Sequence, residues 1–220
     1  MAVITLSREF GSDGTYVAQE VARALNYHFV DKAVIRLVVR VCGYVDFEEM
    51  YEATPGFLAS FDDRRAEILK ILNEVIRALA RHGNMVILGR GAFAVLGGFS
   101  DVLNVRIQAS LPVRVQWAMG HHGITDPAKA EAFVTQRDKA RAAFVEFSYG
   151  VRWDSVRAFD LVVDTDKLSP GVVVKLVVEA HEALVVSKKK ALGQRSTRVI
   201  EVDPILAETV SRVLECNGSH

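Results

Sequence analysis

Residues 2–15, AVITLSREFGSDGT, decide the fold of this 220-residue chain. The first five of them are a short apolar run that predicts a buried strand, and apolar side chains return at helical spacing from Val17 to Leu25. A strand that passes through a glycine-containing turn into a helix is how α/β proteins hold phosphate. The backbone N–H groups at the helix start are unpaired, and the helix dipole adds partial positive charge. The stretch therefore predicts a phosphate-binding turn, with a plain strand-to-helix turn as the alternative.

The turn departs from the usual phosphate-loop signature G-x-x-x-x-G-K-S/T. Gly14 stands about where the lysine is expected, and Asp13 adds a negative charge beside the anion site. We expect Asp13 on the solvated rim of the loop, because a carboxylate pointing inward would repel phosphate. Arg8, directly after the strand, favours phosphate binding because its guanidinium can form paired hydrogen bonds to phosphate oxygens. Ser12 and Thr15 are the candidate ligands for Mg²⁺.

The composition gives no sign of a nucleic-acid or membrane partner. Lys+Arg and Asp+Glu both total 27, so no net charge favours DNA or an anionic lipid surface. The two cysteines, Cys42 and Cys216, lack metal-ligand or redox spacing, which fits a reducing compartment. Charged side chains interrupt the apolar run at 172–186, and the first residues do not look like a signal peptide. We expect a cytoplasmic protein.

Strands and helices alternate along the chain. The expected strands are 2–7, 27–30, 84–88, 102–107 and 159–164, and the expected helices are 14–25, 33–41, 62–82, one that begins near Pro112, 126–148 and one that begins at 169–170. This alternation predicts a parallel sheet covered by helices on both faces, whose ligands bind beyond the carboxyl ends of the strands. Near the end of the chain, 199–202 suggests an edge strand and 205–214 a short helix.

Arg90 lies between Gly89 and Gly91, directly after an expected strand. The glycines allow the backbone to approach a ligand closely, and the guanidinium can bind a phosphate through two hydrogen bonds. An arginine paired with a nearby carboxylate is the alternative interpretation.

A basic run, Gln136 to Arg141, places Arg137 and Arg141 on one face of a helix. The ordinary interpretation is a solvated surface. Here the run precedes several aromatic residues and then the expected strand 159–164. A basic helix over the binding edge is what a phosphoryl-transfer lid needs, since its arginines neutralise transition-state charge and its closure excludes water.

Four segments together resemble the cytidylate kinase-like family, a branch of the P-loop nucleoside monophosphate kinases. They are 4–14, 29–32, 86–92, and 138–141 continuing through Trp153 to 159–161, and they span roughly residues 3–185 in the family's order. The resemblance implies a three-layer α/β fold of the P-loop NTPase type, with helices on both faces of a parallel sheet and a helical lid. It implies a nucleotide kinase-like domain at 1–187, with the lid at about 120–153, and leaves 188–220 as a C-terminal extension.

The resemblance also implies roles for individual residues. The family's loop G-S-G-G corresponds here to Gly11, Ser12, Asp13 and Gly14, so the absent lysine belongs to the branch and Asp13 is this chain's own departure. Members often carry an arginine where this chain has Thr15. Arg90 is expected to hold the acceptor monophosphate, Arg137 and Arg141 to belong to the lid, and Asp31 to lie near the acceptor nucleotide.

The implied activity is phosphoryl transfer from ATP, with Mg²⁺, to a nucleoside monophosphate, CMP or dCMP. Arg8, Arg137 and Arg141 are the expected catalytic residues. One alternative is a nucleotide-binding or regulatory protein with degraded kinase activity, because Asp13 and Thr15 remove favourable charge from the loop. Another is a kinase for a different small acceptor. The extension is expected to pack on its own core or to form a homodimer, and the acidic stretch 43–61 to be an acceptor-binding flap rather than a plain loop.

Overall fold

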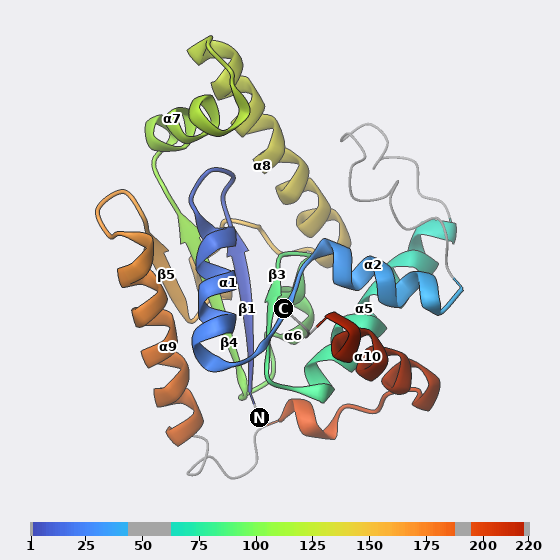
Figure 1. Ribbon diagram of the computed structural model, residues 1–220. Helices are drawn as coiled ribbons and strands as arrows, with labels where there is room; N and C mark the ends of the chain where they lie inside the picture. The colour runs from blue at the N-terminus through green and yellow to red at the C-terminus, as the bar shows by residue number, and fades with distance from the viewer. Residues whose placement is uncertain (1, 44–62, 188–194, 218–220) are drawn as a thin grey trace.

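The computed structural model describes residues 2–43, 63–187 and 195–217, and its centre is a five-stranded parallel sheet (Figure 1). The strand order is β2-β3-β1-β4-β5. The strands are β1 (Val3–Arg8), β2 (His28–Val30), β3 (Met85–Leu88), β4 (Val102–Gln108) and β5 (Leu161–Asp164). All five predicted core strands form, and their parallel pairing confirms the doubly covered α/β fold. Since every strand runs in the same direction, their carboxyl ends meet at one edge.

Two helices, α1 (Gly14–Leu25) and α9 (Pro170–Ser187), cover one face of the sheet. Alternate strand residues such as Ile4 and Leu6 are buried there against Val17, Val21 and Val173. The alternation follows from the period of two in a strand, which points successive side chains to opposite faces. The first helix is thereby fixed directly behind β1, with its start at the carboxyl edge.

The other face is covered by α2 (Lys32–Val41), α5 (Asp63–His82), α6 (Ala92–Leu96) and α10 (Pro204–Asn217). Val3 and Ile87 from the sheet pack there with Leu72, Ile76 and Leu79 of the predicted amphipathic helix. These side chains are almost fully buried. The cluster on this face contains more buried residues than the cluster on the other face, so it is the larger part of the core.

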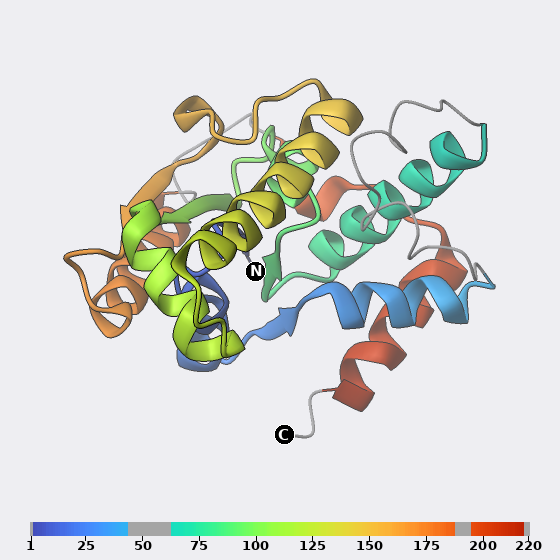
Figure 2. The ribbon, with the colours of Figure 1, turned by 90° about the horizontal axis from the view of Figure 1, so that it is seen from above.

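Two further helices, α7 (Leu111–His122) and α8 (Pro127–Tyr149), lie beyond the carboxyl ends of the strands (Figures 1 and 2). The predicted helices at Pro112 and 126–148 are therefore confirmed. Asp126 accepts hydrogen bonds from the N–H groups of Ala128 (2.9 Å) and Lys129 (3.4 Å), and Pro127 at the first position completes a favourable helix start. Phe144 anchors the far end of α8 in the core.

The prediction of an edge strand at 199–202 is wrong. Thr197–Val199 forms a single 3₁₀ turn, because the buried carboxylate of Asp101 accepts hydrogen bonds from the Thr197 N–H (2.7 Å), the Thr197 hydroxyl (2.8 Å) and the Ser196 hydroxyl (2.6 Å). Val199 is left 71% exposed.

The predicted terminal helix does form, as α10. It packs within its own chain against α2 and α5, and buries Val210, Val213 and Leu214 in the core. A homodimer through the extension stays a prediction. The stretch proposed as a flap, 43–61, lies outside the described residues apart from Gly43.

We expect Asp101→Ala to lower the free energy of unfolding by about 2 kcal/mol, because it leaves the buried N–H and hydroxyl of Thr197 without their acceptor. Urea denaturation followed by circular dichroism measures the change. Glu201→Ala, an exposed carboxylate in the same extension, is the control and should alter stability by less than about 0.5 kcal/mol. Equal effects from the two variants would contradict the anchoring role of Asp101.

Among the helices within residues 2–43, 63–187 and 195–217, none combines the length and the apolar composition that a membrane span requires.

Candidate active site

The loop between β1 and α1, residues 9–13, lies at the carboxyl edge of the sheet. The Glu9 N–H donates to the Ile107 carbonyl at 3.1 Å, and the Ser12 hydroxyl donates to the Glu9 carbonyl at 2.9 Å. Gly11 has φ +81°, and a Cβ there would lie 3.0 Å from the carbonyl oxygen of Arg114. Only glycine suits this combination of a left-handed backbone and close contact. The loop is thus held by β4 and by α7.

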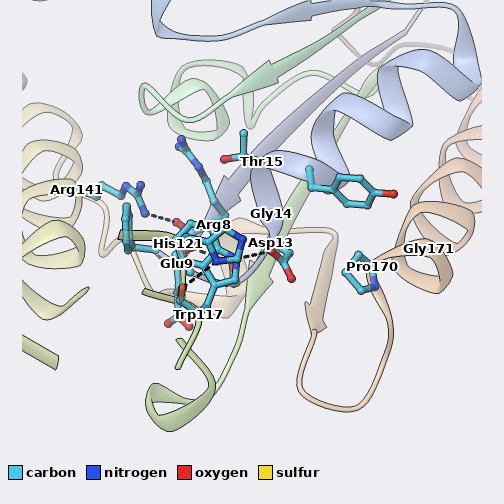
Figure 3. Close-up of a pocket in the computed structure, with 14 residues that line it drawn as sticks. Arg8, Glu9, Asp13, Gly14, Thr15, Trp117, His121, Arg141, Pro170 and Gly171 are labelled. Carbon is cyan, nitrogen blue, oxygen red and sulfur yellow. Dashed lines mark hydrogen bonds between the residues drawn. The ribbon is translucent and has the colours of Figure 1, made fainter. Parts of the chain in front are cut away.

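A pocket of about 690 Å³ opens over this loop (Figure 3). Its floor is the loop itself and the first turn of α1, and its walls come from α7, α8 and the start of α9. The lining residues are Arg8, Glu9, Phe10, Gly11, Ser12, Asp13, Gly14, Thr15, Tyr16, Trp117, His121, Arg141, Pro170 and Gly171. We call it the loop pocket.

A second pocket of about 470 Å³ lies between α1, the start of α2, the end of β3 and helix α8. It is lined by Arg8, Thr15, Asp31, Lys32, Leu88, Arg90, Phe133, Gln136, Arg137, Ala140 and Arg141. We call it the basic pocket, because cationic side chains dominate its lining. Arg8, Thr15 and Arg141 line both pockets, so the two adjoin at these residues.

Arg8 occupies the space beside Gly14 where the lysine of the usual signature would begin. A Cβ on Gly14 would lie 2.5 Å from the Cβ of Arg8, and a Cβ on Gly89 would lie 2.6 Å from the Nη1 of Arg8. The arginine therefore extends from the end of β1 across two glycines, towards the end of β3. The absence of a side chain at Gly14 has a steric reason: Arg8 already fills that place.

Arg90 is held in an unusual backbone conformation. Gly89, Arg90 and Gly91 have φ values of +75°, +57° and +67°, so three consecutive residues are left-handed. Such a conformation is costly for arginine and persists only where the surroundings enforce it. The residue is 3% exposed and lines the basic pocket together with Lys32.

Asp31 begins α2 and caps it. Its carboxylate accepts hydrogen bonds from the N–H groups of Ala33 (2.7 Å) and Val34 (3.2 Å), so the residue has a structural role as well as a place in the lining of the basic pocket.

Asp138 joins the helix α8 to the loop. Its carboxylate accepts from the Phe10 N–H at 2.9 Å and pairs with Arg114 and, at 3.4 Å, with Arg141. Arg141 in turn donates to the Arg8 carbonyl at 3.1 Å. Helix α8 therefore rests on the backbone of the loop through buried and half-buried charges.

Glu9 continues the same charge network towards the sheet. Its carboxylate lies 3.3 Å from Arg106 and 3.5 Å from Arg114, and it accepts from the Ala109 N–H at 3.1 Å. Burial lowers the pKa of Arg106, and the charge of Glu9 opposes that shift. An arginine remains protonated even so. These partners lie about a hundred positions apart, so no local pattern in the sequence could have indicated them.

Arg137 and Arg141 differ in their surroundings, although both were predicted on one face. Arg141 is half-buried against the loop, whereas Arg137 is exposed and lies over the rings of Phe133 (5.0 Å) and Phe10 (6.0 Å). These cation–π contacts favour one orientation of the Arg137 guanidinium and leave it accessible to solvent.

The two predicted magnesium ligands are not equivalent. Ser12 is 2% exposed, and its hydroxyl donates into the backbone of its own loop, which does not suit a metal ligand. Thr15 is exposed and lines both pockets. Within the described residues no three His, Cys, Asp or Glu side chains gather as a metal site.

Asp13 does not lie free on the rim as expected. It is half-buried, and its carboxylate accepts a hydrogen bond of 2.7 Å from the indole Nε1 of Trp117 on α7. The sequence offered no signal for this partner, which is 104 positions away.

Comparisons with known proteins show which family the chain matches. A model of the cytidylate kinase-like family matches residues 3–167. The cytidylate kinase of Pyrobaculum calidifontis is 27% identical over 180 residues, covering 81% of this chain and 92% of the relative. The enzyme of Halobacterium salinarum is 26% identical over 185 residues, covering 82% and 90%.

Solved structures share the fold. A protein from Eubacterium ventriosum, described as uncharacterized, superposes with a TM-score of 0.67 at 19% identity, covering 83% of this chain and 99% of that one. The shikimate kinase of Bacteroides thetaiotaomicron gives a TM-score of 0.51 at 15% identity, covering 82% and 98%. The family match extends over most of the chain and includes the loop, Arg90 and the basic helix, so this chain belongs to the cytidylate kinase-like family.

Proposed function

We propose that this protein transfers the γ-phosphoryl group of ATP to a nucleoside monophosphate, with CMP or dCMP as the acceptor. One observation carries the proposal: two pockets adjoin over the carboxyl edge of the sheet and share Arg8, Thr15 and Arg141. Phosphoryl transfer between two nucleotides needs such a pair of sites, with cationic side chains where they meet. The names of the relatives support the choice of acceptor.

The loop pocket suits the donor. Its floor carries the first backbone N–H groups of α1, which attract phosphate. The rings of Tyr16 and Trp117 line the walls, and such rings provide apolar surface for a nucleobase. We therefore assign the triphosphate to the loop 11–15 and the donor base to the aromatic walls.

The basic pocket suits the acceptor. Arg90, Lys32 and Arg137 of α8 are among its lining residues. A monophosphate is compact and doubly charged, and an arginine binds it through two parallel hydrogen bonds. We assign the acceptor phosphate to Arg90, the neighbourhood of the acceptor nucleotide to Asp31, and the lid to about 120–153 within a domain of residues 1–187.

Catalysis in this proposal depends on position and charge, with no covalent intermediate on the protein. Arg8 and Arg141 lie where the pockets adjoin, so their guanidinium groups neutralise the charge that develops on the transferred phosphoryl group. Arg137 adds a further positive charge on the side of the acceptor. Thr15 is the side chain that would hold Mg²⁺, which when bound neutralises charge on the donor phosphates.

A nucleotide-binding protein with degraded kinase activity is the second candidate. The observation that favours it is Asp13, a carboxylate at the floor of the loop pocket where the family has glycine. A further alternative is another small acceptor, since the superposed structures include a shikimate kinase and a gluconokinase.

The test is ADP formation with MgATP and a panel of acceptors: CMP, dCMP, UMP, AMP, GMP, shikimate and gluconate. Products are separated by ion-exchange chromatography, and thermal melting is recorded on the same samples. We expect turnover to be highest with CMP and dCMP.

Two results would replace the proposal. Stabilisation by ATP and CMP without turnover would favour the binding protein, because a ligand raises the melting temperature by mass action alone. Turnover confined to shikimate or gluconate would assign the basic pocket to another acceptor.

A further inference from the structure

Two acidic residues of the loop line the proposed donor site. Glu9 pairs with Arg106 and Arg114, whereas Asp13 places its negative charge directly at the start of α1. Asp13 precedes α1, in the position from which an aspartate normally accepts hydrogen bonds from the second and third N–H groups of a helix. In α1 these are the amides of Thr15 and Tyr16, and they are the same groups that would bind phosphate. A capping carboxylate would therefore compete directly with the ligand.

Aspartates at the starts of three other helices do make this bond. Asp31 caps α2, Asp126 caps α8 and Asp203 caps α10, each by accepting from two backbone N–H groups. Asp13 makes no side-chain capping bond in α1. The difference therefore lies in the backbone conformation and the surroundings of Asp13 and not in the residue type.

The backbone turns the Asp13 side chain away from the helix. Its φ and ψ are +55° and +10°, in the left-handed region, whereas Asp31 and Asp126 have φ of −113° and −89°. The carboxylate then meets the indole of Trp117, whose Nε1 donates to it at 2.7 Å (Figure 3). A hydrogen bond to a charged acceptor is stronger than one between neutral groups.

The indole is itself fixed in place. The His121 ring stacks on Trp117 with centroids 4.1 Å apart and an interplanar angle of 12°, and the Phe10 ring contacts it edge-on at 5.6 Å. Tryptophan has a single donor and no acceptor. Trp117 is therefore a rigid, neutral donor aimed at one carboxylate oxygen.

We propose that Trp117 is a positioning residue that holds the Asp13 carboxylate off the amides of α1 and so keeps the triphosphate site open. The inference rests on the proposed function, because it concerns the donor site of that reaction. It explains how a loop with an acidic residue in place of the family's glycine keeps a site for ATP. The indole does not neutralise the carboxylate; it determines where the carboxylate lies.

The test is a double-mutant cycle on the full-length protein, read by calorimetric binding of ATP and of inorganic tripolyphosphate. Trp117→Phe keeps an aromatic ring but removes the N–H donor. We expect it to weaken binding of both ligands about tenfold. In the Asp13→Gly background the same substitution should have little effect, because no carboxylate remains to be held.

Steady-state kinetics adds a readout that a loss of packing would not reproduce. Trp117→Phe should raise KM for ATP and leave KM for CMP unchanged, and Asp13→Gly should reverse the increase. Gln116→Ala, an exposed neighbour on the same helix, is the matched control and should behave as the wild type.

The outcomes separate the two claims. If the wild type binds ATP and Trp117→Phe binds it with the same affinity, the role of Trp117 is overturned and the proposed function stands. A tenfold loss that persists in the Asp13→Gly background also overturns it, since the indole would then act by itself. A wild type that binds neither ATP nor tripolyphosphate overturns both.

Discussion

Arg8→Ala is expected to lower kcat about 100- to 1,000-fold, the usual effect of removing one preorganised donor from a developing charge. The arginine extends from β1 over Gly14 and Gly89, and lines both pockets where they adjoin. In the proposed reaction it therefore lies where the phosphoryl group would pass. It fills the space in which the usual phosphate-loop signature has a lysine. Rapid-quench measurement of a single turnover separates this effect from product release.

Two further variants sharpen this prediction. Arg8→Lys keeps the charge but loses the paired hydrogen bonds, so an intermediate rate is expected. Arg23→Ala removes an exposed arginine of α1 that pairs with Glu20 at 2.6 Å and lines neither pocket, and it should leave kcat unchanged. An Arg8→Ala variant that is folded and as active as the wild type would exclude Arg8 from the reaction.

Arg90→Ala is expected to raise KM for the acceptor about 10- to 100-fold, because a hydrogen-bonded charge is lost from the basic pocket. KM for ATP should stay the same, since Arg90 does not line the loop pocket. Alanine accepts the left-handed backbone no worse than arginine, so the fold should remain intact.

Calorimetric titration with CMP measures the acceptor affinity directly. Arg90→Lys retains the charge without the planar guanidinium, and it should recover part of the affinity. Unchanged affinity of Arg90→Ala for the monophosphate would remove the residue from the acceptor site.

The sequence predicted what depends on local patterns. Apolar runs and helical spacing indicated the five strands and the helices around them, and the glycines that flank Arg90 indicated a strand end where the backbone can approach a ligand closely. These features are local because a strand alternates every two residues and a helix repeats every 3.6. The pattern at 199–202 failed for the opposite reason, since Asp101, a hundred positions earlier, determines the conformation there.

The candidate site was predictable only in part for the same reason. Arg8, Thr15 and Arg141 follow from the loop and the basic helix, and the structure brings them to one junction. The hydrogen bond from Phe10 to Asp138 and that from Trp117 to Asp13 join the loop to helices more than a hundred positions away in the sequence. Such contacts depend on how the layers pack, which periodicity does not encode.

The most direct test of the central claim is ³¹P NMR of MgATP mixed with CMP, with the wild type and with Arg8→Ala in parallel. We predict that the wild type produces ADP and CDP in equal amounts, and that Arg8→Ala produces both far more slowly. Release of ADP and inorganic phosphate without CDP, or no reaction by a wild type that is shown to be folded, would contradict phosphoryl transfer to the nucleotide.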